Sequence, residues 1–227
     1  MRTILIVGGS KGIGKAIINN LVNDNKIVNI SRTPPELQHV NLTHHSCDVL
    51  VDELPEIDAV DSLIYCPGSI NLKPFGRLKT EDFQNDFNIN VIGAVKSVQK
   101  YLNLLKNGNS PSILLFSTVA AKLGMPFHAS IAAAKSGVEG LTKSLGAELA
   151  PTIRVNAIAP TVTNTELASK LLRNDRMIEG IKERHPLKKF LNPEEVAEFA
   201  CFIQSEKANS LSGQIFEMDC GIVSFKI

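Results

Sequence analysis

The chain has 227 residues, of which 44% are hydrophobic and 21% charged, and we expect one large globular domain, 1–227, with a sizeable core. Lysine and arginine number 24 and aspartate and glutamate 23. The net charge of +1 gives no reason to expect a polyanion such as DNA, or a membrane surface, as a partner. No apolar run approaches the roughly 18 residues of a membrane-spanning helix.

Short apolar runs alternate with longer helical stretches along the chain. Strands are predicted at Ile4–Val7, Lys26–Ile30, Ser62–Tyr65, Ile113–Phe116 and Arg154–Ile158. Helices are predicted at Gly12–Val22 and near 80–106, 128–149 and 193–205. Strands that alternate with helices indicate right-handed crossovers and a parallel sheet. We therefore predict an α/β fold in one domain, a doubly wound parallel sheet covered by helices on both faces.

One crossover is short for this architecture. Only 13 residues separate Asp48 from Ser62, and Pro55 lies in their middle. A crossover needs at least about ten to twelve residues including its helix. We expect the helix here to be a stub.

The first predicted strand runs directly into a glycine-rich turn and then a helix. One glycine makes the tight turn, a second lets the backbone approach a pyrophosphate, and a third lets the helix pack on the strand. The helix N-terminus supplies free N–H groups and a positive dipole end. This context favours nucleotide binding over a plain turn, with the loop contacts at Gly8, Ser10, Lys11, Gly12, Ile13 and Gly14.

The Gly-x-x-x-Gly-x-Gly spacing of this loop resembles that of the short-chain dehydrogenase/reductase family, and further motifs follow in order along nearly the whole chain. Asp48 resembles the family's adenine-contacting aspartate. Tyr65-Cys66-Pro67-Gly68 lies in the place of its Asn-Asn-Ala-Gly element, without either asparagine. Asn90 matches the asparagine that the family carries on a helix.

The resemblance continues to the C-terminus. Arg154–Pro160 resembles the strand before the family's Pro-Gly element, with Thr161 in place of the glycine, and Ser212-Gly213-Gln214 and Asp219-Cys220-Gly221 resemble its C-terminal signature. The resemblance implies a Rossmann-type fold in three αβα layers. It also implies further cofactor contacts, at Asp48, Val49, Cys66, Pro67, Gly68, Asn90, Lys135, Pro160, Thr161, Val162 and Thr165.

The end of the second strand indicates which nicotinamide cofactor binds. A carboxylate there would bond the adenosine ribose and repel a 2′-phosphate, but this chain has Ser31 followed by Arg32. A guanidinium grips a phosphate bidentately. Lys11 in the glycine loop adds a second cation on the same side. In the family this pairing implies NADP(H).

The family's catalytic group of serine, tyrosine, lysine and asparagine is incomplete here. Lys135 and Asn90 are in place, and Thr118 takes the serine position and keeps a hydroxyl group. The tyrosine position, four residues before the lysine, is Ile131. Because Ala132-Ala133-Ala134-Lys135-Ser136-Gly137 matches the family residue for residue, a shifted alignment does not explain the loss.

Three interpretations stay open. In the first, His128 is the acid, because it lies three residues before Ile131 and its intrinsic pKa suits that role; Ser130 is a weaker candidate on another face. In the second, Thr118 and Asn90 polarise the substrate while a water relayed from Lys135 supplies the proton, or a conjugated C=C bond is reduced. In the third, the protein binds NADP(H) as a sensor or regulator without efficient turnover.

The segment after Thr165 is expected to be the family's substrate lid, at about 165–190, with a helical run from Glu166 to Arg184 of mixed charge. The predicted partners are a small-molecule substrate and further copies of the chain, as a homodimer or homotetramer. The expectation of an oligomer rests on the resemblance and on two long helices, near 80–106 and 128–149, whose apolar positions exceed one stripe and must be covered. No nucleic-acid or membrane partner is predicted.

The cysteines and histidines give no sign of a metal site. No cysteine is paired at metal-ligand spacing, and all are scattered over the chain: Cys47, Cys66, Cys201 and Cys220. We expect reduced, mostly buried thiols and a cytoplasmic location. Four histidines show no metal spacing with carboxylates or cysteines and are assigned no role: His39, His44, His45 and His185.

Overall fold

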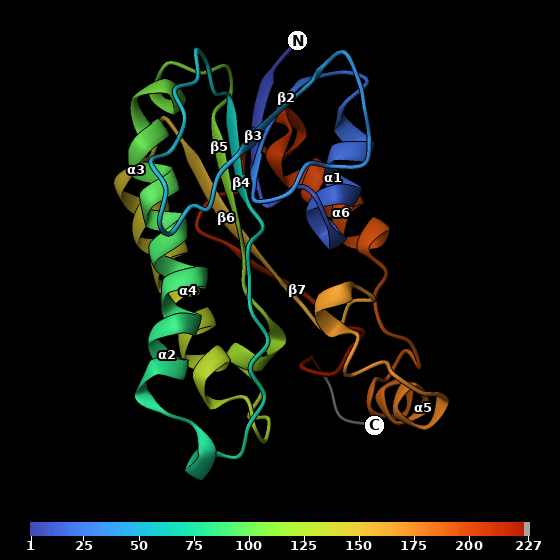
Figure 1. Ribbon diagram of the computed structural model, residues 1–227. Helices are drawn as coiled ribbons and strands as arrows, with labels where there is room; N and C mark the ends of the chain where they lie inside the picture. The colour runs from blue at the N-terminus through green and yellow to red at the C-terminus, as the bar shows by residue number, and fades with distance from the viewer. Residues whose placement is uncertain (225–227) are drawn as a thin grey trace.

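The computed structural model describes residues 1–224 and has three layers, with a sheet between two layers of helices (Figure 1). Neighbouring strands are all parallel and lie in the order β3-β2-β1-β4-β5-β6-β7. Their bounds are β1 Thr3–Val7, β2 Lys26–Ser31, β3 Leu42–Ser46, β4 Ser62–Tyr65, β5 Ser112–Phe116, β6 Arg154–Pro160 and β7 Ile215–Met218. The predicted Rossmann-type αβα fold is confirmed.

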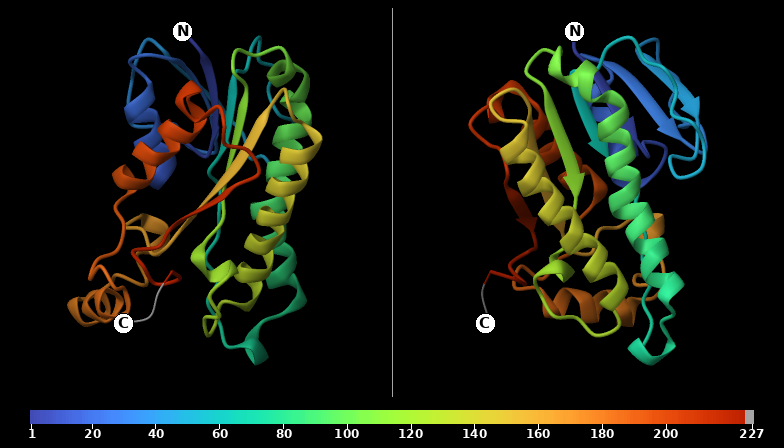
Figure 2. Two further views of the ribbon diagram at one scale, coloured as in Figure 1. Left: turned by 180° about the vertical axis from the view of Figure 1, so that it is seen from behind. Right: turned by 90° about the vertical axis from the view of Figure 1, so that its left-hand side faces the viewer.

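The helices divide between the two faces of the sheet, as Figures 1 and 2 show. One face is covered by α1 (Gly12–Leu21) and α6 (Pro193–Gln204), and the other by α3 (Gly93–Lys106) and α4 (Ala129–Glu148). Helix α2 (Thr80–Phe87) packs against α4. Helix α5 (Asp175–Arg184) lies beyond the carboxyl ends of the strands.

Burial on both faces explains why the strands are almost entirely apolar. Successive side chains on a strand point to opposite faces. Leu5 and Leu63 belong to the core beneath α3 and α4, whereas their neighbours Ile4 and Ile64 belong to the core beneath α1 and α6. A sheet covered on one side would need apolar residues only at alternate positions.

The order of strands reverses at β1, which pairs with β2 on one side and β4 on the other. The chain leaves β1 at Gly8 and β4 at Cys66, and the Cys66 N–H donates to the Val7 carbonyl at 2.9 Å. Ligands of doubly wound sheets bind in the crevice at this reversal. The fold therefore brings the glycine loop beside the segment Cys66-Pro67-Gly68.

The predicted stub helix between Asp48 and Ser62 is wrong, because this segment contains no helix. It begins with a turn in which the N–H groups of Val51 and Asp52 donate to the Asp48 carbonyl. The rest is held by tertiary contacts, since Tyr101 on α3 donates its hydroxyl to the Pro55 carbonyl at 2.8 Å. This crossover is therefore held in place by a side-chain hydrogen bond to its backbone and not by the hydrogen bonds of a helix.

Two further helical predictions need correction. The stretch near 80–106 is helical but is divided by a π-turn at Asn88–Ile92, which separates α2 from α3. The lid is helical only at Glu166–Ala168 and in α5, because the chain between them forms turns. Asn174, whose side chain accepts from the Met177 N–H, begins α5 anew.

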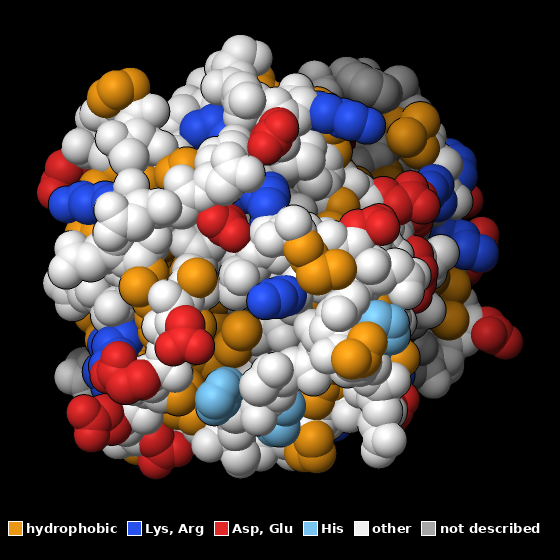
Figure 3. Space-filling model, turned by 90° about the horizontal axis from the view of Figure 1, so that it is seen from above, with side chains coloured by type: hydrophobic (Ala, Val, Ile, Leu, Met, Phe, Trp, Pro, Cys, Tyr) orange, Lys and Arg blue, Asp and Glu red, His pale blue; other side chains and the backbone are white. Residues whose placement is uncertain are grey.

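On the face seen from above, positive and negative side chains are interspersed over most of the surface, and several acidic side chains lie near one another at the lower left (Figure 3). Within residues 1–224 no helix is long and apolar enough to cross a bilayer. The same residues hold no group of three or more histidine, cysteine or acidic side chains placed to bind a metal ion. All four cysteines are free; Cys47 and Cys220 are buried, and Cys66 and Cys201 are half-buried.

Candidate active site

The glycine loop needs its glycines for conformation and for space. Gly8 and Gly12 have φ angles of 81° and 52°, which disfavour other residues. A methyl group at Gly14 would lie 2.4 Å from the Gly8 carbonyl oxygen, and one at Gly8 would lie 3.0 Å from the Pro67 ring. The backbone is therefore packed tightly where α1 begins, with its N-terminal N–H groups directed at the crevice.

Asn29 in β2 holds this loop in place. It is fully buried, and its Oδ1 accepts from the Gly9 N–H at 2.9 Å. Its Nδ2 donates to Ser31 Oγ at 2.9 Å and lies 3.1 Å from His44 Nδ1. The sequence analysis identified neither Asn29 nor His44 as part of the site. The signal that pointed to Asn29 was an amide side chain inside an otherwise apolar strand.

A cavity of about 430 Å³ beside the glycine loop, here the loop cavity, is lined by nine of the nineteen residues predicted to contact the cofactor. Arg32 Nη1 lies 3.9 Å from an Asp48 carboxylate oxygen in a largely exposed pair. Lys11 Nζ lies 2.7 Å from Glu166, so the lid partly neutralises this cation. The cavity is lined by the predicted residues Gly8, Ser10, Lys11, Ser31, Arg32, Asp48, Val49, Pro67 and Gly68.

A second cavity, of about 180 Å³ and here called the apolar cavity, adjoins the first at Gly68. Aliphatic side chains form much of its wall, among them Ile70, Leu72, Met125, Leu167 and Leu171. It is also lined by the predicted residues Ile13, Cys66, Pro160, Thr161, Val162 and Thr165. Two adjoining cavities with a glycine cradle between β1 and α1 suit an extended dinucleotide.

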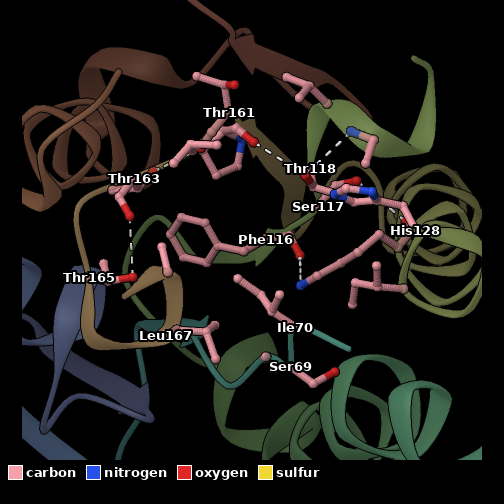
Figure 4. Close-up of a pocket in the computed structure, with 18 of the residues that line it drawn as sticks. Ser69, Ile70, Phe116, Ser117, Thr118, His128, Thr161, Thr163, Thr165 and Leu167 are labelled. Carbon is pink, nitrogen blue, oxygen red and sulfur yellow. Dashed lines mark hydrogen bonds between the residues drawn. The ribbon is translucent and has the colours of Figure 1, made fainter. Parts of the chain in front are cut away.

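The catalytic candidates His128, Lys135 and Thr118 line the apolar cavity together with Ile131, and Figure 4 labels His128 and Thr118 on its right-hand side. The fourth candidate, Asn90, is not among the residues that line this cavity. Helix α4 begins at Ala129, so His128 is its N-terminal cap residue. Ile131 is only 4% exposed. The position that would carry the family's phenol thus presents an aliphatic wall one helical turn from Lys135.

Lys135 is buried, and its Nζ donates to the Phe116 carbonyl at 2.7 Å (Figure 4). Burial lowers the pKa of Lys135 to about 8, although the nearby Cys66 and Asp86 act in the opposite direction. Burial raises the pKa of the Cys66 thiol to about 12. The lysine therefore titrates close to neutral pH while its cysteine neighbour stays a thiol.

His128 is held in one tautomer. Its Nδ1 lies 2.7 Å from the Pro126 carbonyl, which can only accept, so Nδ1 carries the proton. In the neutral ring, Nε2 is then the acceptor, and it is the atom at which this side chain would gain or lose a proton. Phe127, between the two partners, has a φ of 70°, a left-handed conformation that is strained for a bulky residue.

The Thr118 hydroxyl is held only by long hydrogen bonds. It donates to the Pro160 carbonyl at 3.4 Å and accepts from the Ala120 N–H at 3.4 Å. Bonds of this length are weak. Ser117 and Thr118 both line the cavity, but Ser117 is buried and donates to Glu139 at 2.8 Å, so Thr118 is the less firmly held hydroxyl of this segment.

Asn90 lies in the π-turn, a feature frequent at functional sites. Its Nδ2 donates to the Asp86 carbonyl at 2.7 Å and to Ser69 Oγ at 3.0 Å. Ser69 in turn donates to Asp86 Oδ1 at 2.6 Å. The sequence analysis identified Asn90 but not Ser69, which lies 21 residues earlier and becomes its neighbour only through the fold, nor Asp86, which lies four residues before it.

His185, to which the sequence assigned no role, joins the lid to the loop after β6. Its buried ring places Nδ1 2.7 Å from the Ile181 carbonyl and Nε2 2.7 Å from Thr161 Oγ1. Because Nδ1 must donate to a carbonyl, Nε2 accepts from the Thr161 hydroxyl. Thr161, which stands where the family has glycine, thereby ties the lid to the cavity.

Neither tyrosine lines the apolar cavity. Tyr65 lines the loop cavity and donates to the Ile89 carbonyl at 2.6 Å, and burial raises its pKa. Tyr101 is bound to Pro55 beneath α3, as described above. A tyrosine from elsewhere in residues 1–224 therefore does not replace the phenol missing at Ile131.

The glycine cradle at the reversal of a parallel sheet, with a lysine, a threonine hydroxyl and an asparagine beside it, defines a nucleotide-binding α/β protein. Residues 11–223 match the family model for Enoyl-(Acyl carrier protein) reductase. The chain belongs to the short-chain dehydrogenase/reductase family, and the comparisons support an oxidoreductase of that type.

Individual relatives are distant but match over their full length. The chain is 27% identical to carbonyl reductase [NADPH] 2 of Sus scrofa, over 97% of this chain and 96% of that protein. It is 28% identical to 3-oxoacyl-[acyl-carrier-protein] reductase FabG of Thermotoga maritima, over 98% of each chain. The solved structure of ElxO with NADP bound is 26% identical, with a TM-score of 0.89 and 99% of each chain covered.

Proposed function

We propose that this protein is an NADP(H)-dependent reductase of a small carbonyl compound or a conjugated enoyl compound, with a proton donor other than tyrosine. The observation that carries the proposal is the apolar cavity, where Lys135, Thr118 and His128 line the space that adjoins the glycine cradle at Gly68. The nicotinamide, when bound, supplies the hydride. The chain supplies the binding groove, the polar contacts and the proton.

The preference for NADP(H) rests on Arg32 and Lys11 at the loop cavity. Because Glu166 already pairs with Lys11, the Arg32 guanidinium is the better available partner for a 2′-phosphate. The names of two relatives support the choice, a carbonyl reductase that uses NADPH and ElxO with NADP bound.

His128 is the first candidate for the proton donor. Its fixed Nδ1–H leaves Nε2 to accept a proton from solvent and deliver it to a substrate oxygen in the apolar cavity. In the competing route, Thr118 and Asn90 polarise the substrate and Lys135 donates through a water molecule. Neither route needs a tyrosine.

We further propose that the protein acts in the cytoplasm as a homodimer or homotetramer. The support is the outer surface of α4, where small residues such as Ala129, Ala133 and Gly140 are exposed. Small side chains let another helix approach closely. An oligomer would cover this surface.

The decisive experiment measures NADPH consumption with panels of carbonyl and enoyl compounds, alongside NADPH binding by fluorescence. We expect turnover that is lost in Lys135→Met. Ile131→Tyr restores the family's phenol beside Lys135 and should increase carbonyl reduction, since the lysine's charge lowers the pKa of the new phenol. Tight NADPH binding with no turnover in either the natural protein or Ile131→Tyr would refute the reductase and leave a sensor.

A further inference from the structure

A buried acid lies next to the candidate active site and has no part in the chemistry described so far. Asp86, on the last turn of α2, is 2% exposed. Its Oδ1 accepts from Ser69 at 2.6 Å, whereas its Oδ2 has no hydrogen-bond partner within residues 1–224. A buried carboxylate with a single hydrogen bond is costly unless an opposite charge compensates it.

The acid is connected to the site through Asn90 and Ser69. Asn90 donates to both the Asp86 carbonyl and Ser69 Oγ, and its own Oδ1 has no partner in the part of the chain that the structure describes. A methyl group placed on Gly68 would lie 3.4 Å from Asn90 Oδ1 and 3.6 Å from Lys135 Nζ. The amide oxygen of Asn90 and the Lys135 ammonium therefore flank the same point of the backbone.

Asp86 is the suitable counter-charge for Lys135. The other titratable neighbour, Cys66, keeps its proton because burial raises its pKa to about 12. His128 stands seven residues earlier on α4 and is hydrogen-bonded to Pro126, and Glu139 on the same helix is engaged by Ser117. Asp86 also opposes the effect of burial on the lysine.

We propose that Asp86 is a positioning residue of the reductase site, which fixes Asn90 through Ser69 and provides the buried negative charge opposite the Lys135 ammonium. This role rests on the proposed function. A counter-charge for Lys135 matters more in this protein than it would if a tyrosine phenol stood beside the lysine. With Ile131 in place of tyrosine, Lys135 is the cation on which proton delivery depends. Ser69 links Asp86 to Asn90, because its hydroxyl donates to the first and accepts from the second, and Figure 4 shows that hydroxyl directed away from the cavity centre.

The test follows the titration of Lys135 itself, so that it does not depend on turnover. Full-length protein labelled with 13C at lysine Cε is titrated by NMR, and the Lys135 signal is identified by its loss in Lys135→Met. In the natural protein we expect a midpoint near 8. In Asp86→Asn, which keeps the shape and removes the charge, the midpoint should fall by about one pH unit.

The matched control is Asp82→Asn, four residues earlier on α2, whose carboxylate is paired with Lys73 at 2.7 Å. It should leave the Lys135 midpoint unchanged. Ser69→Ala and Asp86→Glu both keep the charge and should also leave it unchanged, so they test the proposal even if Asp86→Asn does not fold. An unchanged or higher midpoint in folded Asp86→Asn, or an equal fall in Ser69→Ala or Asp86→Glu, would overturn the counter-charge.

The steady-state pH profile is the second readout. If the protein is a reductase, the alkaline limb of kcat should move to lower pH in Asp86→Asn and stay in place in Asp82→Asn. A protein without turnover would refute the proposed function but leave the NMR result standing. A normal Lys135 midpoint in Asp86→Asn, with active enzyme, would refute only the role of Asp86.

Discussion

Lys135 and Ile131 lie one turn apart on the same face of α4, yet only Lys135 brings a polar group to the apolar cavity. Its pKa of about 8 is set mainly by burial. At the scale of single residues, the site is therefore defined by a cation that titrates near neutrality, a histidine with one proton-accepting nitrogen, and a weakly held hydroxyl group. Three substitutions examine the lysine, the histidine and Arg32, the proposed partner of a 2′-phosphate.

We expect Lys135 to make the free energy of unfolding rise with pH between about 8 and 10.5. Its pKa falls from 10.5 to about 8 on folding, so in this window the unfolded chain binds more protons and stability increases as pH rises. The full contribution is on the order of 3 kcal/mol. Urea unfolding of the natural protein and Lys135→Met should diverge across the window; a constant difference would contradict the shift.

His128→Ala should lower kcat by about 100-fold or more if His128 is the acid, and leave NADPH affinity intact, because this side chain lies in the apolar cavity rather than the loop cavity. The matched control is His45→Ala, on the edge strand β3. Stopped-flow reduction and fluorescence titration check the two quantities. An unchanged kcat would transfer the role to Thr118 and a water molecule.

Arg32→Ala should weaken NADPH binding by about ten- to a hundredfold, since a charge-assisted hydrogen bond contributes about 1.5–3 kcal/mol. NADH, which has no 2′-phosphate, should bind almost as before. Isothermal titration with both cofactors measures the change, and Arg77→Ala, an exposed arginine near α2, is the control. Equal losses for both cofactors would mean that Arg32 is structural and the phosphate is held elsewhere.

Of the secondary-structure elements, the lid is held in place by contacts with the rest of the protein and not by one continuous helix. Turns separate Glu166–Ala168 from α5, and two of the side-chain contacts of this region join it to residues that line the cavities. One is the exposed pair of Lys11 and Glu166, which contributes little. The other is the buried hydrogen bond between Thr161 and His185, which fixes the C-terminal end of α5 beside the cavity.

His185→Ala should therefore loosen the lid. The change leaves the Ile181 carbonyl and the Thr161 hydroxyl without their partner, which costs about 1–3 kcal/mol in a buried site. We expect a lower Tm, faster proteolysis within about 165–190 and a higher KM for substrate. Thr161→Ser keeps the hydroxyl and serves as the control. Proteolysis at the natural rate in His185→Ala would show that other contacts hold α5.

At the level of the whole molecule, the outer surface of α4 and α2 exposes apolar side chains. Phe87 and Ile92 are 43% and 38% exposed beside the small residues of α4. A two-fold interface between two copies of the chain would cover both side chains. The two long helices that the sequence made candidates for an interface do lie on one face of the sheet, as α3 and α4 (Figure 2).

We expect light scattering at micromolar concentration to give two or four times the 24.7 kDa of one chain. Ala133→Glu places a charge on the exposed surface of α4 and should shift the mass toward one chain, while Lys143→Glu, a change at an already polar exposed position, should not. A mass near that of one chain for the natural protein would contradict the predicted oligomer.

The sequence alone determined the parallel sheet, the glycine loop and the order of the motifs, because these depend on local patterns. Buried parallel strands must be apolar throughout, and a tight turn before a helix must carry glycines. Ile131 was likewise visible in the sequence from its distance to Lys135. The β1–β4 reversal lies beside a cavity lined by nine of the residues that the motifs predict to contact a cofactor.

The tertiary structure decided everything that depends on meetings between distant segments. The crossover at Pro55 has no helix because Tyr101, 46 residues away, supplies its hydrogen bond. His185 gains a partner only where the lid folds back onto Thr161, and Asp86 meets Ser69, 17 residues earlier in the chain, only because the two segments pack together. Side-chain hydrogen bonds and burial arise from packing between elements, so no local pattern in the sequence contains them.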